Sequence, residues 1–214
     1  MIEGLLQEDL VDELLTFVEQ NLSMDGHRGG VRNLLDVPTM RELAESSPVR
    51  GQVEAVLGKD ARAVRGILFD KTENANWKVP WHQDVTIAVN RRVDADGFGP
   101  WSQKEGVLHV QPPASVLEKM VSIRFHLDDC PEENGALRVI PGSHLNGKLL
   151  EREIQSLAER SLVVTCAMRR GGALLMRPLL LHASSASSVP SHRRVIHVEY
   201  AITSLPNGLE WAVN

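Results

Sequence analysis

Apolar positions near the start of the chain follow a helical pattern. They recur at spacings of three and four residues, at Leu6, Leu10, Leu14, Phe17 and Val18. Such spacing places the apolar side chains on one face of an amphipathic helix. Two more short helices are expected over residues 39–45 and, directly after Pro48, over residues 49–57. The pattern therefore predicts a helical layer over residues 1–60.

From about residue 61 the pattern changes to short segments of apolar or alternating character. Gly, Pro, Asn and Asp separate them, and they read ARAVRGILFD, PWHQDVTIAV, GVLHV, MVSIRFHLDD, ALRVI, LVVTC, ALLMR and RRVIHVEYAI. Segments of this kind are typical of β-strands. Asn134-Gly135 is a dipeptide of the hairpin type and Pro141-Gly142 marks another turn, whereas residues 148–160 predict a helical insertion.

About eight short strands in one chain favour a sandwich or a barrel, and a double-sheet jelly roll is the natural candidate. The chain has 214 residues and contains no internal repeat or low-complexity linker. We therefore expect one domain over residues 1–214, mainly β with flanking α-helices. Its jelly-roll core would occupy residues 61–203, behind the helical layer.

Composition narrows the function classes. The formal net charge is -5, which argues against a nucleic-acid partner, because such partners leave a basic footprint. No apolar run approaches the roughly 18 residues of a membrane span. The N-terminal MIEGLLQEDLVDELL lacks the basic start and apolar centre of a signal peptide, so we expect a cytoplasmic protein. Cys130 and Cys166 are too few for a disulfide framework or a thiolate cluster.

Three short histidine–carboxylate pairs are candidate metal ligands. Mononuclear iron oxygenases bind the metal on one face with two histidines and one carboxylate. Residues i and i+2 of a strand point the same way, so His-x-Asp or His-x-Glu can supply two of the three. The pairs here are His82-Gln83-Asp84, His126-Leu127-Asp128 and His197-Val198-Glu199.

The first pair is favoured by its position. In WHQDVTIAV a continuous alternation would place His82 and Asp84 on one face, and enough strands follow to reach a distant third ligand. Asp128, by contrast, directly precedes a turn and fits a turn residue. The third pair lies so near the end of the chain that a far partner would have to lie upstream.

The distant ligand is expected at His182. An apolar strand runs into this histidine, a Ser-rich loop follows, and Arg193-Arg194 open the next strand. If the two strands pair antiparallel, one arginine returns beside His182. An arginine there could hold a dicarboxylate with both arms of its guanidinium group. The alternative is that His182 is a capping or core histidine and that the arginines face solvent.

Together these segments resemble the phytanoyl-CoA dioxygenase family of iron(II)- and 2-oxoglutarate-dependent oxygenases. The matching segments, over about residues 66–200, are WHQD, HLDDCPEENGALRVIPGSH, GGALLMRPLLLHASS and RRVIHVEY, in the family's order. The resemblance implies a double-stranded β-helix, with His82, Asp84 and His182 as iron ligands. It also implies that Arg193 binds the far carboxylate of 2-oxoglutarate, with Arg194 as the alternative if the register slips by one residue.

The resemblance further implies the reaction. Related halogenases replace the ligand carboxylate with a small residue, so the presence of Asp84 points to hydroxylation of a C–H bond of a small molecule, with consumption of 2-oxoglutarate and O₂. Two other functions remain open at this point. One is a non-catalytic jelly-roll protein that binds a metal or ligand, and the other is a metal-dependent hydrolase with a zinc-bound water.

Further contacts are expected around the metal. Lys71, Asn76 and Trp77 are candidates for the cosubstrate, and Trp101 for the substrate. Trp101 lies in residues 90–111, a long segment whose glycines, proline and charges predict an irregular loop. Because it leaves the strand that carries His82 and Asp84, the segment is a candidate lid over the site; the alternative is a surface insertion without such a role.

Overall fold

The main sheet of the molecule is antiparallel and four-stranded. The computed structural model describes residues 1–22, 30–73, 75–189 and 192–213. The main sheet has the order β1-β11-β6-β9. Its strands are β1 (Arg62–Lys71), β11 (Arg193–Ala201), β6 (Met120–His126) and β9 (Ala173–Met176).

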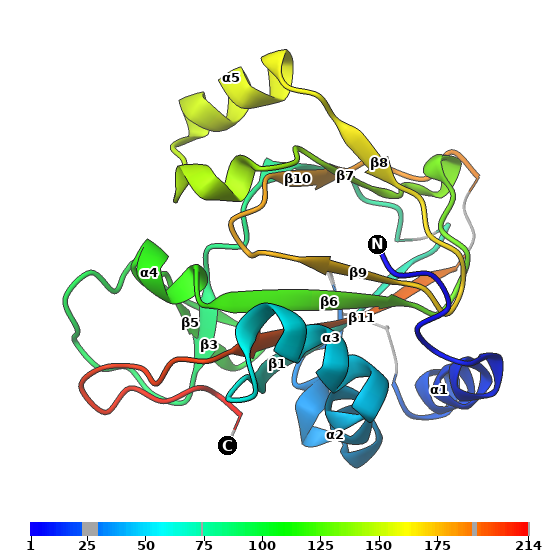
Figure 1. Ribbon diagram of the computed structural model, residues 1–214, viewed down its shortest axis with the longest axis horizontal. Coiled ribbons are helices and arrows are strands. Elements are labelled where there is room, and N and C mark those ends of the chain that lie inside the picture. Colours follow the sequence, from blue (N-terminus) through cyan, green and yellow to red (C-terminus); the bar gives the residue numbers. More distant parts are fainter. Residues whose placement is uncertain (23–29, 74, 190–191, 214) are drawn as a thin grey trace.

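A second antiparallel sheet lies above the main one and encloses the interior (Figure 1). Its order is β2-β10-β7-β8. The strands are β2 (Val79–His82), β10 (His182–Ser184), β7 (Leu137–Val139) and β8 (Val164–Cys166). Two such sheets face to face make the predicted jelly roll, and the fold class is confirmed.

Helices cover the face of the main sheet that points away from the second sheet (Figure 1). They are α1 (Glu8–Asn21), α2 (Pro38–Glu45) and α3 (Ser47–Leu57). Val11, Leu14 and Val18 of α1 share one core cluster with apolar residues of β1, β6 and β11. The predicted helical stripe is thus buried against the sheet. None of the helices in the described residues is both long and apolar enough to cross a bilayer.

Smaller helical elements occupy the connections. The α-helices α4 (Ala114–Leu117) and α5 (Glu151–Arg160) flank the sheets, and α5 falls within the predicted insertion. The 3-10 helices are η1 (Leu34–Asp36), η2 (Glu132–Asn134) and η3 (Ser143–Asn146). The Asn134-Gly135 turn closes η2 rather than a hairpin, because β6 and β7 belong to different sheets.

A third sheet confirms the strand expected over GVLHV and corrects the irregular loop expected over residues 90–111 in its second half. It has the order β3-β5-β4, with β3 (Ile87–Val89), β5 (Val107–Val110) and β4 (Trp101–Lys104). Glu105 and Gly106 form a two-residue turn with φ of 50° and 80°. Positive φ at both turn residues suits the twist of a tight hairpin, so this part of the segment is regular structure.

The long strand expected over WHQDVTIAV is also corrected, because β2 ends at His82 and β3 begins at Ile87. The two strands belong to different sheets. Asp84 therefore lies in the connection rather than in a continuous alternating strand.

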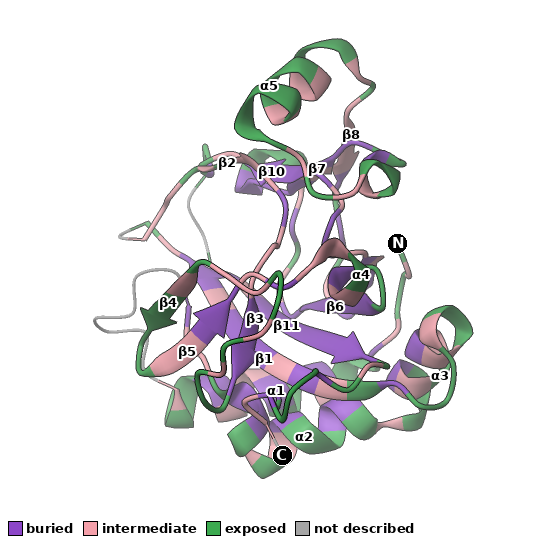
Figure 2. Ribbon diagram, turned by 90° about the vertical axis from the view of Figure 1, so that its left-hand side faces the viewer, coloured by how far each residue is buried: buried purple, intermediate pink, exposed green. Residues whose placement is uncertain are grey.

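The main sheet presents a polar inner face to the second sheet. Along β11, Ile196, Val198 and Tyr200 pack into the helical core cluster. Successive residues of a strand point to opposite faces. The alternate residues Arg193 and His197 accordingly line an interior cavity. Figure 2 shows that the strands of this sheet are mostly buried, whereas exposed residues gather on the helices.

Candidate metal centre

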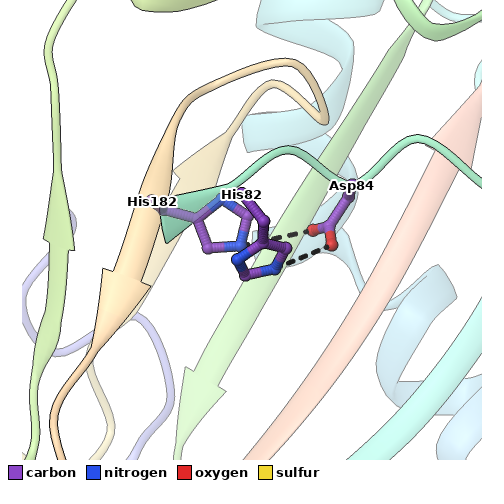
Figure 3. A group of neighbouring side chains, drawn as sticks. All are labelled: His82, Asp84 and His182. Atoms are coloured by element: carbon purple, nitrogen blue, oxygen red, sulfur yellow. Dashed lines mark ion pairs between the residues drawn. The ribbon is translucent and has the colours of Figure 1, made fainter. Parts of the chain in front are cut away.

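Three side chains converge at one end of the second sheet (Figure 3). One ligand atom from each of His82, Asp84 and His182 lies within 4.8 Å of the others. The Nε2 atoms of His82 and His182 lie 3.6 and 3.7 Å from the two carboxylate oxygens of Asp84. These distances exceed an ordinary hydrogen bond, so the three groups surround a common point instead of pairing directly.

Strand pairing brings these residues together. His82 at the end of β2 lies opposite His182 at the start of β10 in the antiparallel register. The backbone N–H of Asp84 donates to the carbonyl of Pro178 at 2.9 Å, which fixes the chain just after β2. His82 and Asp84 thus come together as the sequence predicts, although they lie at a strand end and in the connection after it rather than in one strand.

Backbone hydrogen bonds orient both imidazoles. Nδ1 of His82 lies 2.9 Å from the carbonyl of Pro80, and Nδ1 of His182 lies 2.8 Å from the carbonyl of Leu180. A carbonyl only accepts, so each Nδ1 carries a proton, and in the neutral imidazole Nε2 then keeps the lone pair that a metal needs. Such a partner on the outer nitrogen is the usual support of a metal-binding histidine. Two imidazole lone pairs and one carboxylate fit a mononuclear iron site.

The electrostatic environment of His182 and Asp84 favours the protonation states that bind metal. Burial lowers the pKa of His182 to about 4, so this imidazole is neutral at physiological pH. Burial alone would raise the pKa of Asp84, but the neighbouring His182 and His82 bring it well below the usual value. A neutral imidazole and an ionised carboxylate are the forms in which these groups bind a cation.

Gln83 points away from the site and ties its surroundings together. It is buried, and its Nε2 donates to the carbonyls of Leu179 at 2.7 Å and Gly147 at 2.9 Å. Its Oε1 accepts from the backbone N–H of Leu149 at 2.8 Å. Gln83 therefore connects the histidine–aspartate segment to the chain before α5 and to the chain before β10.

We predict that Gln83→Ala lowers the free energy of unfolding by about 1–3 kcal/mol, because it leaves buried backbone groups without partners. Thermal unfolding measures this change. The matched control is Gln103→Ala, which removes one exposed hydrogen bond and should leave the melting temperature unchanged. Equal melting temperatures for the two variants would contradict the role of Gln83.

The ligand cluster opens into an interior cavity of about 210 Å³. Arg193 lines this cavity, is buried, and donates through one Nη to the carbonyl of Gly135. Its Nε has no hydrogen-bond partner among the described residues. A buried guanidinium group with an unused donor can bind a carboxylate.

Arg194 occupies the opposite face of β11. Its Nε and Nη2 donate to the two oxygens of Asp128 at 2.9 and 2.7 Å, and Nη1 pairs with Glu19. The charges and hydrogen-bonding groups of Arg194 and Asp128 are thus paired with each other, away from the cavity. The expected pairing of the strands that carry His182 and Arg193 is wrong, because β10 and β11 lie in different sheets. The two residues meet across the interior instead.

Two of the other predicted contacts lie near Arg193. Lys71 is buried beside Arg193 in the β1–β11 register, and its Nζ donates to Oγ of Ser184 at 3.2 Å. The same Nζ lies 5.6 Å from the ring centre of Trp77, which lines the cavity.

The structure gives the remaining two candidates different roles. The side-chain amide of Asn76 donates to the backbone carbonyl of Ser187 at 2.8 Å and accepts from its backbone N–H at 2.6 Å. These two hydrogen bonds connect Asn76 to the loop after β10. Trp101 does not line the cavity; it packs against the cluster around Val110 and lies under Arg92. Trp101 is the one partly buried residue of β4, and its side chain packs into a core cluster that includes Ile87, Val110 and Trp211.

Sequence reasoning missed several cationic and imidazole groups of the cavity wall. They are Arg32, Arg65, Lys104, His109 and Arg124; His197, which the sequence offered only as a candidate metal ligand, lines the same wall. Arg124 is buried on β6, where one Nη lies 3.2 Å from Nδ1 of His197. Polar residues at alternate positions of otherwise apolar strands were the available signal, because such residues face an interior site when the other face is core.

Comparison with known proteins gives consistent matches. The family described as phytanoyl-CoA dioxygenase (PhyH) matches residues 10–195. An L-proline trans-4-hydroxylase of Streptomyces griseoviridis is 29% identical over 162 residues, which cover 63% of this chain. The chain spans about half the length of that relative, 52%.

Solved structures share the fold at low identity. HygX from Streptomyces hygroscopicus, with nickel and 2-oxoglutarate bound, has a TM-score of 0.67 at 20% identity and covers 94% of this chain and 82% of its own. The epimerase SnoN, in complex with Fe3+, alpha ketoglutarate and nogalamycin RO, has a TM-score of 0.67 at 19% identity, with 97% and 85% covered.

Proposed function

This chain belongs to the phytanoyl-CoA dioxygenase family, and from that premise we propose that it is a non-haem iron(II)- and 2-oxoglutarate-dependent dioxygenase. The observation that carries the proposal is the meeting of His82, Asp84 and His182 with Arg193 in one cavity. A hydrolase or a simple metal-binding protein needs the metal ligands but has no use for a buried cation placed to hold a dicarboxylate.

Each residue has a distinct task in this proposal. His82, Asp84 and His182 would hold iron(II), and Arg193 and Lys71 would bind the far carboxylate of 2-oxoglutarate. Bound iron supplies the oxidising chemistry with O₂, by which 2-oxoglutarate becomes succinate and CO₂ and a C–H bond of the substrate becomes C–OH. The protein orients both organic molecules and excludes water from the interior. Asp84 would supply a carboxylate ligand where related halogenases carry a small residue, which favours hydroxylation.

The proposal extends to the substrate class, the domain organisation and the compartment. The substrate is a small molecule, since the cavity lies inside the jelly roll, and the 29% identical relative is named for the hydroxylation of proline. We propose that the chain acts as one oxygenase domain over residues 1–214. Cys130 and Cys166 are both free and buried, which fits a reducing compartment such as the cytoplasm.

Succinate formation tests the proposed activity. The protein with iron(II), 2-oxoglutarate and O₂ should produce succinate and CO₂, and omission of either iron or O₂ should stop the reaction. A hydrolase would act without O₂, and a binding protein would bind metal and produce no succinate. Either result would refute the oxygenase.

We predict a fall in 2-oxoglutarate affinity above pH 8. Burial, with the charge of Arg193, lowers the pKa of Lys71 to about 8. The ammonium form that attracts a carboxylate is therefore present below this pKa and lost as the pH rises through it. Hydrogen bonds to charged groups are strong enough that the loss should cost about tenfold or more in affinity.

Calorimetry on the nickel-loaded protein between pH 7 and pH 9 measures this effect without turnover. Lys71→Met should bind 2-oxoglutarate more weakly at pH 7 and show a flatter pH profile. Lys78→Met, at an exposed position, is the matched control and should retain the fall. A profile in Lys71→Met as steep as in the unmodified protein would exclude Lys71 as its cause.

A further inference from the structure

The inner face of the main sheet carries positive charge toward both ends of the cavity. Lys71 pairs with Arg193 at one end of the β1–β11 ladder, and Arg65 pairs with Glu199 toward the other. Six positions of β11 separate Arg193 from Glu199, which corresponds to about 20 Å along a strand. His197 lies between them and interacts electrostatically with Asp84. The metal centre thus faces the middle of the ladder.

Three strands and one loop contribute the cationic residues at the end of the cavity opposite Arg193 and Lys71. We call it the basic end and define it by four residues that line the cavity, Arg32, Arg65, Lys104 and His109. Arg65 comes from β1, Lys104 and His109 from the β4–β5 hairpin, and Arg32 from the segment before η1. The hairpin that replaced the expected loop therefore supplies half of the basic end.

The positive charge of the basic end is only partly neutralised. Arg65 forms an ion pair with the buried carboxylate of Glu199, and Arg32 lies 3.7 Å from Glu105. Lys104 has no ion-pair partner in the part of the chain that the structure describes. In the same part, Nε of Arg32 and Nε of Arg65 are buried without a hydrogen-bond partner.

Mutual repulsion among these groups is visible in their pKa values. Burial and the charges of Arg32 and Arg65 lower the pKa of Lys104. Burial, together with the same cations and Lys104, lowers the pKa of His109 to about 4. Among the described residues that line the cavity, Asp84 provides the only carboxylate, and it is committed to the metal centre. An anion entering the basic end would relieve this repulsion.

We propose that the basic end binds an anionic group of the organic substrate, a carboxylate or a phosphate, and thereby directs a C–H bond of that substrate toward the metal centre. The inference rests on the proposed function and adds the substrate class to it. The cosubstrate does not account for the basic end, because Arg193 and Lys71 lie at the opposite end of the ladder. Lys104 has no ion-pair partner in the described part of the chain and Arg32 has an Nε without a hydrogen-bond partner there, so we expect these two cations to bind the anionic group.

Matched pairs of charged and neutral probes test the proposal. The protein is loaded with nickel and 2-oxoglutarate, and calorimetry measures the binding of butyrate against butyramide and of butyl phosphate against butanol. At least one charged probe should bind about 10- to 100-fold more tightly than its neutral counterpart, the usual worth of hydrogen bonds to a charged group. The pair that shows the difference identifies carboxylate or phosphate.

Variants connect this preference to the basic end. Lys104→Met and Arg32→Met should each reduce the preference for the charged probe about tenfold and leave 2-oxoglutarate affinity unchanged. Lys59→Met, exposed between α3 and β1, is the matched control and should keep the preference. Equal binding of charged and neutral probes, or a preference that both variants retain, would overturn the inference. Failure of 2-oxoglutarate itself to bind would instead refute the proposed function.

Discussion

Replacement of His82, Asp84 or His182 by alanine is expected to abolish tight iron(II) binding and all succinate formation. Each residue supplies one of the three atoms that lie within 4.8 Å of one another. Loss of even an outer partner of a metal ligand typically costs about 10- to 100-fold in affinity, so loss of a ligand should exceed that. Anaerobic calorimetry with iron(II) measures the affinity, and circular dichroism should show an unchanged fold.

The competing histidine–carboxylate pair provides the control. Neither His126 nor Asp128 lines the cavity, and Asp128 is held by Arg194 on the other face of the sheet. His126→Ala and Asp128→Ala should therefore retain iron binding, although Asp128→Ala should lower the melting temperature. Loss of the metal in these two variants, with retention in the variants of His82 or His182, would transfer the site to the other pair.

Local patterns in the sequence predicted α1, α2, α3, α5 and most of the strands correctly. The stripe that includes Leu14 and Val18 became α1 because a helix with one apolar face must bury that face. The alternation in RRVIHVEY became β11, with its apolar face on the helices and its polar face on the cavity. In both cases the period of one short segment decides its conformation and its buried side.

The sheet to which each strand belongs could not be predicted from local patterns, because it depends on strands that are distant in the sequence. Nothing local to WHQDVTIAV marks the passage from one sheet to another between His82 and Ile87. Likewise, the strands that begin at His182 and Arg193 are neighbours in sequence but pair with different sheets. The histidine–aspartate pair was still predicted correctly, because the two residues lie close together whether they share one strand or sit at a strand end and in the following connection.

The cavity wall illustrates the same limit for function. Glu105-Gly106 is a weaker hairpin signal than Asn-Gly, so the sequence predicts the strand GVLHV, which is β5, but not its hairpin partner β4. The place of Lys104 and His109 in the cavity wall depends on that hairpin, so the sequence pattern did not reveal it. Residues that bind the metal belong to short, specific motifs, whereas the basic residues of the wall are single positions on separate strands. Only the assembled sheets show that they share a cavity.

Arg193→Ala is expected to raise the concentration of 2-oxoglutarate needed for half-maximal rate by about 30-fold or more. Truncation of one partner of a buried charge pair costs about 2–5 kcal/mol, which corresponds to about 30- to 4,000-fold. Arg193 is buried on the cavity side of β11, and its Nε has no partner within the described residues, so the carboxylate would lose a desolvated donor. Calorimetry on the nickel-loaded protein separates this loss of binding from any loss of turnover.

Arg194→Ala gives the sharpest contrast, because it removes the same side chain one position along the same strand. Its guanidinium group is used by Asp128 and Glu19 on the other face of β11, so its loss should lower the melting temperature and leave 2-oxoglutarate affinity nearly unchanged. Arg193→Lys should lie between the two, since it keeps the charge but loses the planar pair of donors. If Arg194→Ala weakened 2-oxoglutarate binding more than Arg193→Ala, the cosubstrate could not lie on the cavity side of β11.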